Sequence, residues 1–302
     1  MSRRFLGVFF PILAGIYLLG VVLPADHDVD SDVKLAYVSL DLFSCGGDDD
    51  DDDDGEIGTQ YPIVLLHGFM GWGYAGPVFS NYYKVLDHLK DHGFEVYEPA
   101  VTPIATIEER AAQIAALIDA KYPNQKVNLI AHSQGGVDAR YLISSMGWGD
   151  RVASLTTIST PHDGTALADI AAGLTPGVAD WIIDAVIGWF GQDWDVVDQL
   201  THDYMEEVFN PENPDDQRVA YYSFHGDGDT VFVGLWPTYA VMDLFEGCND
   251  GIVGCVSATY GEDLGALPTD HFGVVGHPVG FVSFDHLELY LEHAEFLRDQ
   301  GF

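Results

Sequence analysis

Positive charge is the scarcest property of this sequence. Its 302 residues include 12 lysines and arginines against 48 aspartates and glutamates, which gives a formal net charge of −36 at pH 7. Because such a surface repels phosphate groups, the balance excludes nucleic acid as a partner and disfavours anionic membranes. The hydrophobic content of 47% is ordinary for a folded chain, so we expect a globular and strongly acidic protein.

Cysteine is also scarce, with three residues in the chain. No cysteine and histidine spacing matches a zinc site, so no metal centre is predicted. Cys248 and Cys255 are seven positions apart and can close a small loop by a disulfide in an oxidising compartment. Cys45 is then the cysteine without a partner in this interpretation.

Residues 1–25 have the pattern of an export signal. Two arginines precede an uncharged apolar run at residues 5–23, and Ala25 offers a cleavage site. A run of this length also suffices to span a bilayer, so an uncleaved membrane anchor stays open. We expect an exported protein, either secreted or periplasmic.

Residues 26–60 are polar and rich in aspartate, which predicts a disordered tether before a folded domain over residues 61–302. The run 42–47, followed by seven aspartates, resembles the lipidated cysteine and acidic tether of bacterial lipoproteins. A phenylalanine and an aspartate before Cys45 fit that pattern poorly. Lipidation at Cys45 is therefore a second alternative for the N-terminus.

Short apolar runs alternate with helical patterns after residue 60. We expect strands at residues 62–66, 94–97, 127–130, 155–158 and 220–224, and helices at residues 81–92, 134–146 and 285–298. Thr106 and Glu109 form a capping box, which opens one more helix. This alternation predicts an α/β fold with a mainly parallel sheet and helices on both faces.

Residues 165–215 interrupt the alternation with a short, very apolar and aromatic stretch at residues 178–190. The stretch can be one more core helix, or it can be a lid over a cleft. In the second interpretation, the lid's substrate-binding face consists of Trp181, Ile182, Ile183, Val186, Ile187, Trp189 and Phe190.

Ser133 lies between a predicted buried strand and a predicted helix. This strand–turn–helix context is what a nucleophile elbow requires. The tight turn needs small residues two positions before and two after the serine, and Ala131 and Gly135 meet that need. Attack on a carbonyl also needs backbone donors for the oxyanion, which we expect from the N–H groups of Phe69 and Gln134.

The acid and the base of such a site follow the serine in that order along the chain. The acid candidates are Asp227, Asp229 and Asp250, and the base candidates are His271, His277, His286 and His293. A loop position favours His271, whereas His286 and His293 lie in a predicted helix. The residues by themselves leave both choices open.

Four segments resemble bacterial triacylglycerol lipases of the Pseudomonas–Burkholderia type: residues 63–71, 127–141, 157–164 and 249–253. The resemblance extends over residues 61–300, more weakly at 170–218. It implies the α/β-hydrolase fold with a helical lid insertion at about residues 165–215. It also implies a serine hydrolase that cleaves lipid esters at a lipid–water interface, and it leaves open the need for a lipase-specific folding helper.

Position by position, the resemblance implies Ser133 as nucleophile, Asp250 as acid and His271 as base. His286 stays as the alternative base. The oxyanion donors again fall at Phe69 and Gln134, and the aromatic stretch falls where these lipases have their lid.

Two departures from the family pattern concern a metal and a disulfide. These lipases hold a structural calcium through an aspartate two residues after the catalytic histidine, and Gly273 stands there instead. We therefore expect no required cofactor and doubt the calcium. Their disulfide reaches far upstream, whereas Cys255 has Cys248 as its nearest partner here.

Other functions remain compatible with the same residues. An esterase, a phospholipase or a polyester depolymerase would use the same triad. A cell-surface lipoprotein that binds lipids without catalysis is the alternative from another class.

Overall fold

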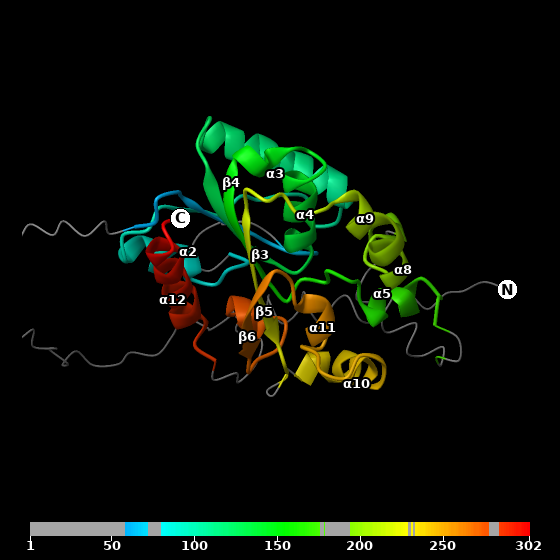
Figure 1. The fold of residues 1–302 in the computed structure, drawn as a ribbon. Helices are drawn as coiled ribbons and strands as arrows, with labels where there is room; N and C mark the ends of the chain where they lie inside the picture. Colours follow the sequence, from blue (N-terminus) through cyan, green and yellow to red (C-terminus); the bar gives the residue numbers. More distant parts are fainter. Residues whose placement is uncertain are drawn as a thin grey trace, which may run out of the picture. The chain divides into compact units, whose positions relative to one another are not determined.

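Six parallel strands form a single sheet in the order β2-β1-β3-β4-β5-β6 (Figure 1). The structure, a computed structural model, describes residues 58–71, 80–175, 178, 194–228, 231, 233–277 and 284–302, all within the unit Glu56–Phe302. The strands are β1 Ile63–Leu66, β2 Val96–Tyr97, β3 Val127–His132, β4 Val152–Ile158, β5 Ala220–Gly226 and β6 Glu262–Leu267.

Helices connect these strands and cover both faces of the sheet. The helices among the described residues are α2 Val85–Asp91, α3 Ile107–Lys121, α4 Gln134–Ile143, α5 Ala166–Ala171, α7 Trp194–Asp198, α8 His202–Tyr204, α9 Asn210–Glu212, α10 Trp236–Phe245, α11 Cys255–Ala258 and α12 His286–Asp299. The expected α/β fold, with a parallel sheet between helices, is confirmed.

The strand β1 shows how the sequence divides the core into two layers. Successive side chains of a strand point to opposite faces, and Ile63 and Leu65 pack with α2 and α12 whereas Val64 and Leu66 pack with α3 and α4. All four are buried, which is why the run is apolar without alternation.

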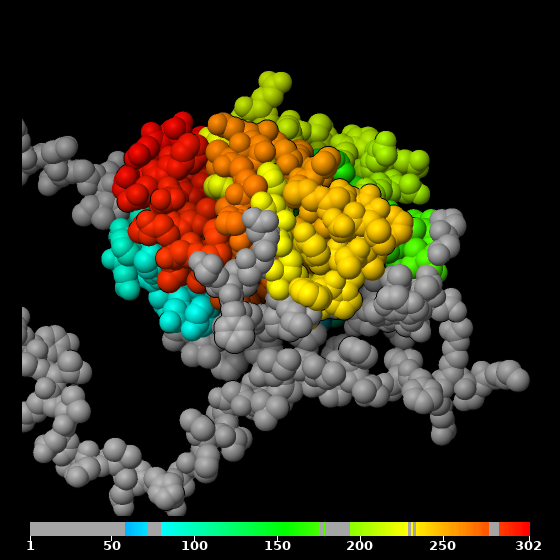
Figure 2. Space-filling view, turned by 90° about the horizontal axis from the view of Figure 1, so that it is seen from below, coloured from blue at the N-terminus to red at the C-terminus, as the bar shows by residue number. Residues whose placement is uncertain are grey.

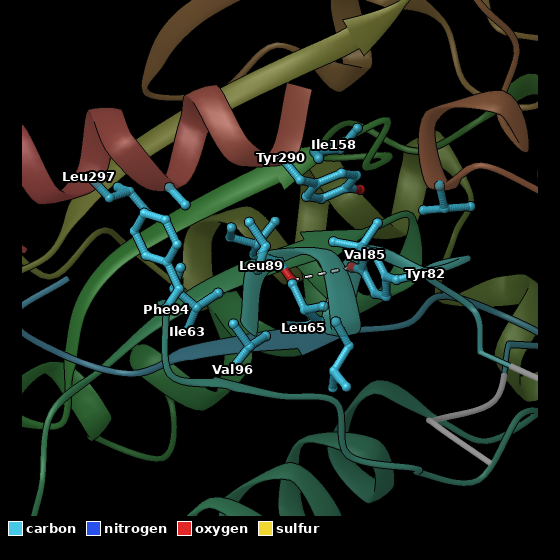
Figure 3. Close-up of a cluster of buried hydrophobic side chains, with 14 of the residues drawn as sticks. Ile63, Leu65, Tyr82, Val85, Leu89, Phe94, Val96, Ile158, Tyr290 and Leu297 are labelled. Carbon is cyan, nitrogen blue, oxygen red and sulfur yellow. Dashed lines mark hydrogen bonds between the residues drawn. The ribbon is translucent and has the colours of Figure 1, made fainter. Parts of the chain in front are cut away.

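Helices α2 and α12 lie side by side on one face of the sheet (Figure 1 and Figure 2). Figure 3 shows the layer beneath them, where Tyr82 and Tyr290 meet edge to face with ring centroids 5.6 Å apart. The Tyr82 hydroxyl donates to the carbonyl of Leu66, at 2.8 Å. The end of β1 is therefore held from this layer as well as by its own ladder.

Helix α3 begins where the capping box predicts. The Thr106 side chain is the N-cap and accepts a hydrogen bond from the backbone N–H of Glu109. Ile107, Ile114 and Ile118 are buried at helical spacing. This helix is thus specified by local sequence.

Other elements differ from the sequence-based expectations. Helix α2 begins at Val85 because Lys84 has a left-handed backbone with φ of 61°. Strand β6 was not predicted, since most of its residues are exposed or half-buried and carry no apolar run. Helix α10 was not predicted either, because apolar residues surround most of its axis and hide the period of 3.6.

Several expectations fall outside the described residues. These are the export signal at residues 1–25, nearly all of the acidic tether with Cys45, Asp229 and the seven lid residues from Trp181 to Phe190. Within the part of the chain that the structure describes, no helix is long and apolar enough to cross a membrane.

His293 of α12 gives the fold a measurable response to acid. Its imidazole is buried beside the Thr156 hydroxyl of β4, with 2.7 Å between Nε2 and Oγ1, and burial lowers its pKa to about 3. The unfolded chain binds a proton at this histidine below about pH 6.5, whereas the folded chain binds it only near its lowered pKa. The histidine therefore removes stability as the pH falls through this window, at about 1.4 kcal/mol per pH unit.

We predict that His293→Gln lowers the free energy of unfolding at pH 7 but makes it less sensitive to acid. The difference in the free energy of unfolding between wild type and variant narrows by about 1.4 kcal/mol for each pH unit below about pH 6. Urea unfolding at pH 7, 6, 5 and 4.5 measures this difference. A difference that stays constant with pH would contradict a buried neutral histidine.

Candidate active site

Ser133 sits at the carboxyl end of β3, directly before the first residue of α4. Its φ of 56° and ψ of −133° are rare for a residue with a side chain. A backbone of this kind costs on the order of 1–3 kcal/mol and persists only where its surroundings enforce it. It turns the hydroxyl away from both the strand and the helix, at the edge of the sheet where open α/β folds bind ligands.

Two glycines allow this turn to exist. A Cβ added at Gly68, in the loop after β1, would lie 2.6 Å from the Cβ of Ser133. A Cβ added at Gly135 would lie 2.7 Å from the carbonyl oxygen of Leu66. Both positions need glycine because the elbow packs against the end of β1, and this explains the small residue expected two positions after the serine.

His271 contacts both Ser133 and Asp250. Its Nε2 is 3.0 Å from Oγ of Ser133, and its Nδ1 is 2.8 Å from Oδ2 of Asp250. All three residues are buried, although 138 positions separate the serine from the histidine. The structure therefore brings together the three residues that the resemblance implied.

The carboxylate of Asp250 is fixed by its own loop. Its Oδ1 accepts hydrogen bonds from the backbone N–H groups of Ile252 and Val253, at 3.0 and 2.8 Å. A disulfide between Cys248 and Cys255, with 5.4 Å between their Cα atoms, closes the chain around this turn. The other oxygen, Oδ2, is thereby aimed at His271.

His286 does not take part in this arrangement. Its Nε2 is 2.9 Å from the carbonyl oxygen of Tyr83, a residue next to α2. His293 is buried under α12 against Thr156. The loop histidine, His271, is the one that Ser133 contacts.

His132, next to the serine, is a site residue that the motif did not single out. Its Nε2–H donates to the carbonyl of His271 at 3.0 Å, and the two rings lie 4.5 Å apart. Burial, followed by the neighbouring His271, holds the pKa of His132 well below its ordinary value. His132 is therefore neutral at pH 7 and positions the loop of His271 without adding charge beside it.

A second neutral histidine holds the loop after β1. The backbone N–H of Val101 donates to Nε2 of His67 at 3.1 Å, so Nδ1 carries the proton and donates to the Gly68 carbonyl at 3.0 Å. Burial, together with the charge of Arg110, lowers the pKa of His67 to about 4. The loop that carries Gly68 and Phe69 is thus fixed around a ring of defined tautomer.

The expected oxyanion donors border the serine from two sides. Phe69 follows Gly68, which lies against Ser133, and its half-buried ring packs with α5, α7 and α10. Gln134 is the first residue of α4, so its N–H belongs to the open end of that helix. The N-terminal end of a helix also favours negative charge.

Arg110 of α3 links the parts of this site and was not identified from the sequence. Its Nε donates to Asp138 Oδ2 at 2.7 Å, and its terminal nitrogens donate to the carbonyls of Thr102 at 2.7 Å and His67 at 2.6 Å. Both partners of the ion pair are fully buried. Burial raises the pKa of Asp138 to about 7, and the Arg110 guanidinium opposes that rise.

The residues near His271 do not fit the calcium site of the resembling lipases. A Cβ at Gly273 would run into Thr269 Oγ1, and Asp270 Oδ1 already accepts the backbone N–H groups of Phe272 and Gly273 at 3.0 and 2.8 Å. Among the described residues no group of three or more histidine, cysteine, aspartate or glutamate side chains is placed to hold a metal.

A parallel sheet with a strained serine after β3, and a histidine between that serine and an aspartate, defines an α/β-hydrolase fold of the lipase and esterase type. A family model described as palmitoyl protein thioesterase matches residues 62–208. A triacylglycerol lipase of Vibrio cholerae is 30% identical over 287 residues, which cover 80% of this chain and 89% of that protein. The chain belongs to the bacterial triacylglycerol lipase family.

Other relatives agree with this assignment. A triacylglycerol lipase of Pseudomonas fragi is 26% identical over 292 residues, with 82% of this chain and 99% of that protein covered. Triacylglycerol lipase 2 of Saccharomyces cerevisiae is 34% identical over an alignment of 203 residues, which covers 62% of this chain and 59% of that protein. This chain therefore matches about three-fifths of the yeast relative.

Solved structures support the fold. The metagenomic carboxyl esterase MGS0156 has a TM-score of 0.63 at 18% identity, with 80% of this chain and 76% of that chain covered. The mature form of the Bacillus licheniformis lipase BlEst2 has a TM-score of 0.60 at 24% identity, with 76% and 91% covered.

We predict that Arg110→Met lowers the free energy of unfolding by about 3–5 kcal/mol, because it leaves the carboxylate of Asp138 buried without its partner. Arg110→Lys restores part of this loss but not all, since an ammonium group cannot match three acceptors that a planar guanidinium reaches. Urea unfolding measures both variants.

The matched control is Arg151→Met. Arg151 pairs with Asp119 at 2.6 Å, but that aspartate is half exposed, so removing this pair costs about 1 kcal/mol or less. A loss for Arg110→Met no greater than for Arg151→Met would show that the buried network does not hold the fold.

Proposed function

We propose that this chain is an exported triacylglycerol lipase of the Pseudomonas–Burkholderia type, which cleaves carboxylic esters of lipids through an acyl-enzyme. The observation that carries the proposal is the contact of His271 with both Ser133 and Asp250. The relatives described as triacylglycerol lipases support the substrate class.

In the proposed reaction, Nε2 of His271 accepts the proton of the Ser133 hydroxyl as the oxygen attacks the ester carbonyl. Asp250 keeps the proton of His271 on Nδ1 and stabilises the imidazolium that forms. The imidazolium then gives its proton to the leaving alcohol, and the acyl group remains on Ser133. Water, activated by His271 in the same way, releases the fatty acid.

The tetrahedral intermediate carries an oxyanion, for which we propose the backbone N–H groups of Phe69 and Gln134 as donors. Each such donor stabilises the transition state by on the order of 3 kcal/mol. The proximity of Gly68 to Ser133 supports this placement, because a larger residue would push the loop away from the serine.

An apolar layer borders the same loops and supports an acyl-chain substrate. Its buried members come from α5, α7 and α10, and Phe69, Val178 and Ile252 pack against it. We propose that Trp181, Ile182, Ile183, Val186, Ile187, Trp189 and Phe190 continue this apolar layer as a lid that opens at a lipid–water interface. We propose that neither a calcium ion nor any other cofactor is required.

We propose export from the pattern of residues 1–25, with a membrane anchor at residues 5–23 or lipidation at Cys45 as the forms in which the enzyme would stay attached. The strong negative charge supports a protein that remains dispersed outside the cell.

A phosphonate ester of a fatty alcohol tests the nucleophile. We expect one adduct, mapped by mass spectrometry to Ser133, and a mass for the intact protein that shows where the mature chain begins. Ser133→Ala should lose the adduct and at least about 1,000-fold of the hydrolysis of triolein and p-nitrophenyl butyrate. An adduct on another serine, or a Ser133→Ala variant with full activity, would refute the proposal.

Acyl thioesters are the second candidate substrate class, favoured by the match of residues 62–208 to the palmitoyl protein thioesterase model. The same acyl-enzyme would form from either substrate. Comparing kcat/KM for palmitoyl-CoA with that for p-nitrophenyl palmitate separates the two classes.

A further inference from the structure

Helix α10 has an exposed apolar face. Trp236 is 68% exposed and Leu244 is 78% exposed, and Pro237 and Ala240 are exposed between them. Positions 236, 240 and 244 are four residues apart, so their side chains follow one side of the helix. We call Trp236, Pro237, Ala240 and Leu244 the outer face of α10.

The opposite side of the same helix is packed beside the candidate active site. Val241 and Met242 are buried in the apolar layer that α5 and α7 share, and Phe69 and Ile252 pack against that layer. At the helix start, Leu235 contacts the position of Gly251, next to Asp250. The outer face therefore lies on an element that borders both the loop after β1 and the loop of Asp250.

The outer face has an acidic margin and no basic residue, because the exposed Asp243 lies three positions after Ala240 on the same side of the helix. Asp243 is the charged residue of the helix, and no lysine or arginine occurs in it. In a protein with a net charge of −36, an aromatic and aliphatic face that has an aspartate at its margin and no basic residue does not fit an anionic membrane. It fits an uncharged apolar surface, and tryptophan is well suited to the boundary between such a surface and water.

We propose that the outer face of α10 is a docking surface for uncharged lipid, which holds the enzyme on a fat droplet with the active site beside the droplet surface. This inference rests on the proposed function as a lipase and adds to it a second lipid contact, on α10. Amphipathic helices bind lipid surfaces in this way, by placing their apolar side chains at the boundary.

The size of the face favours lipid over a second copy of the chain. The helix has 10 residues and is about 15 Å long. Four side chains on such a helix offer a few hundred Å² at most, roughly half of the about 800 Å² that each partner buries in a stable protein complex. A lipid surface needs no matching partner shape, so this area is enough for adsorption.

Figure 2, which views the molecule from below, shows α10 and α11 in gold and orange on the surface. The disulfide between Cys248 and Cys255 ties the start of α11 to the segment after α10. Val256 of α11, 79% exposed, follows Cys255 directly. The disulfide thus connects the docking helix, the Asp250 turn and one more exposed apolar side chain.

The experiment measures adsorption separately from catalysis. Proteins that also carry Ser133→Ala, so that the lipid stays intact, are mixed with triolein droplets coated with phosphatidylcholine and floated by centrifugation. We expect Trp236→Ser/Leu244→Ser to lower the partition onto droplets at least about 10-fold, because both side chains lose contact with the apolar phase. Ala240→Glu, which places a charge in the same face, should lower it similarly.

The matched control is Met146→Ser/Val208→Ser, since these side chains are exposed by 37% and 38% and lie outside α10. This control should bind droplets within about twofold of the parent protein. With Ser133 restored, the α10 variants should hydrolyse soluble p-nitrophenyl acetate within about twofold of wild type. Circular dichroism verifies that every variant is folded.

Unchanged droplet binding by both α10 variants would overturn the docking proposal. So would a wild-type dimer in analytical ultracentrifugation that these variants dissociate, because the face would then be a protein interface. If the wild type adsorbs to droplets through α10 but hydrolyses neither triolein nor p-nitrophenyl acetate, the lipase function is refuted. The docking surface is then still supported.

Discussion

One buried guanidinium connects the elements that hold Ser133. Arg110 extends from α3 to Asp138 on α4 and to the carbonyl of His67 at the end of β1. Helix α4 begins directly after Ser133, and the loop after His67 contains Gly68, which touches Ser133. The unfavourable backbone of Ser133 can persist because α4 and the loop after β1, which flank it, are both held in place. The ion pair, the ring of His67 and the packing of Gly135 on β1 hold them. Since the pair is out of water, its removal affects every one of these elements together.

The histidines around Ser133 differ in their hydrogen-bond partners, although all of them are buried. His67 and His132 have lowered pKa values and stay neutral at pH 7, so they act as hydrogen-bond donors of fixed tautomer. His271 instead has the Asp250 carboxylate at Nδ1 and the Ser133 hydroxyl at Nε2. Among these three histidines, His271 is therefore the one that lies between a carboxylate and a serine hydroxyl.

The sequence predicts the fold well where buried strands and helix caps are encoded locally. The runs at β1 and β3, the capping box at Thr106 and the small residues around Ser133 were sufficient to predict the α/β class and the position of Ser133 between a strand and a helix. Asp250 and His271 could not be chosen from chemistry alone, because several aspartates and histidines share their loops and spacing carries no distance information. Arg110 gave no signal in the sequence, since an arginine in an amphipathic helix usually faces water and its burial depends on Asp138, 28 positions away.

Asp250 and His271 differ from Ser133 in how they are held. Asp250 accepts two backbone N–H groups from residues 252 and 253, and Asp270 accepts two from residues 272 and 273. Each loop is thus closed by its own aspartate, the first also by a disulfide, and the backbone N–H of His271 donates to the Asp250 carbonyl at 3.0 Å to join them. The relative position of Asp250 and His271 is therefore fixed within residues 248–275, whereas the position of Ser133 depends on α3, α4 and β1. These two separately stabilised parts meet at the contact between His271 and Ser133. A shift of either part would therefore change the distance between Nε2 of His271 and Oγ of Ser133.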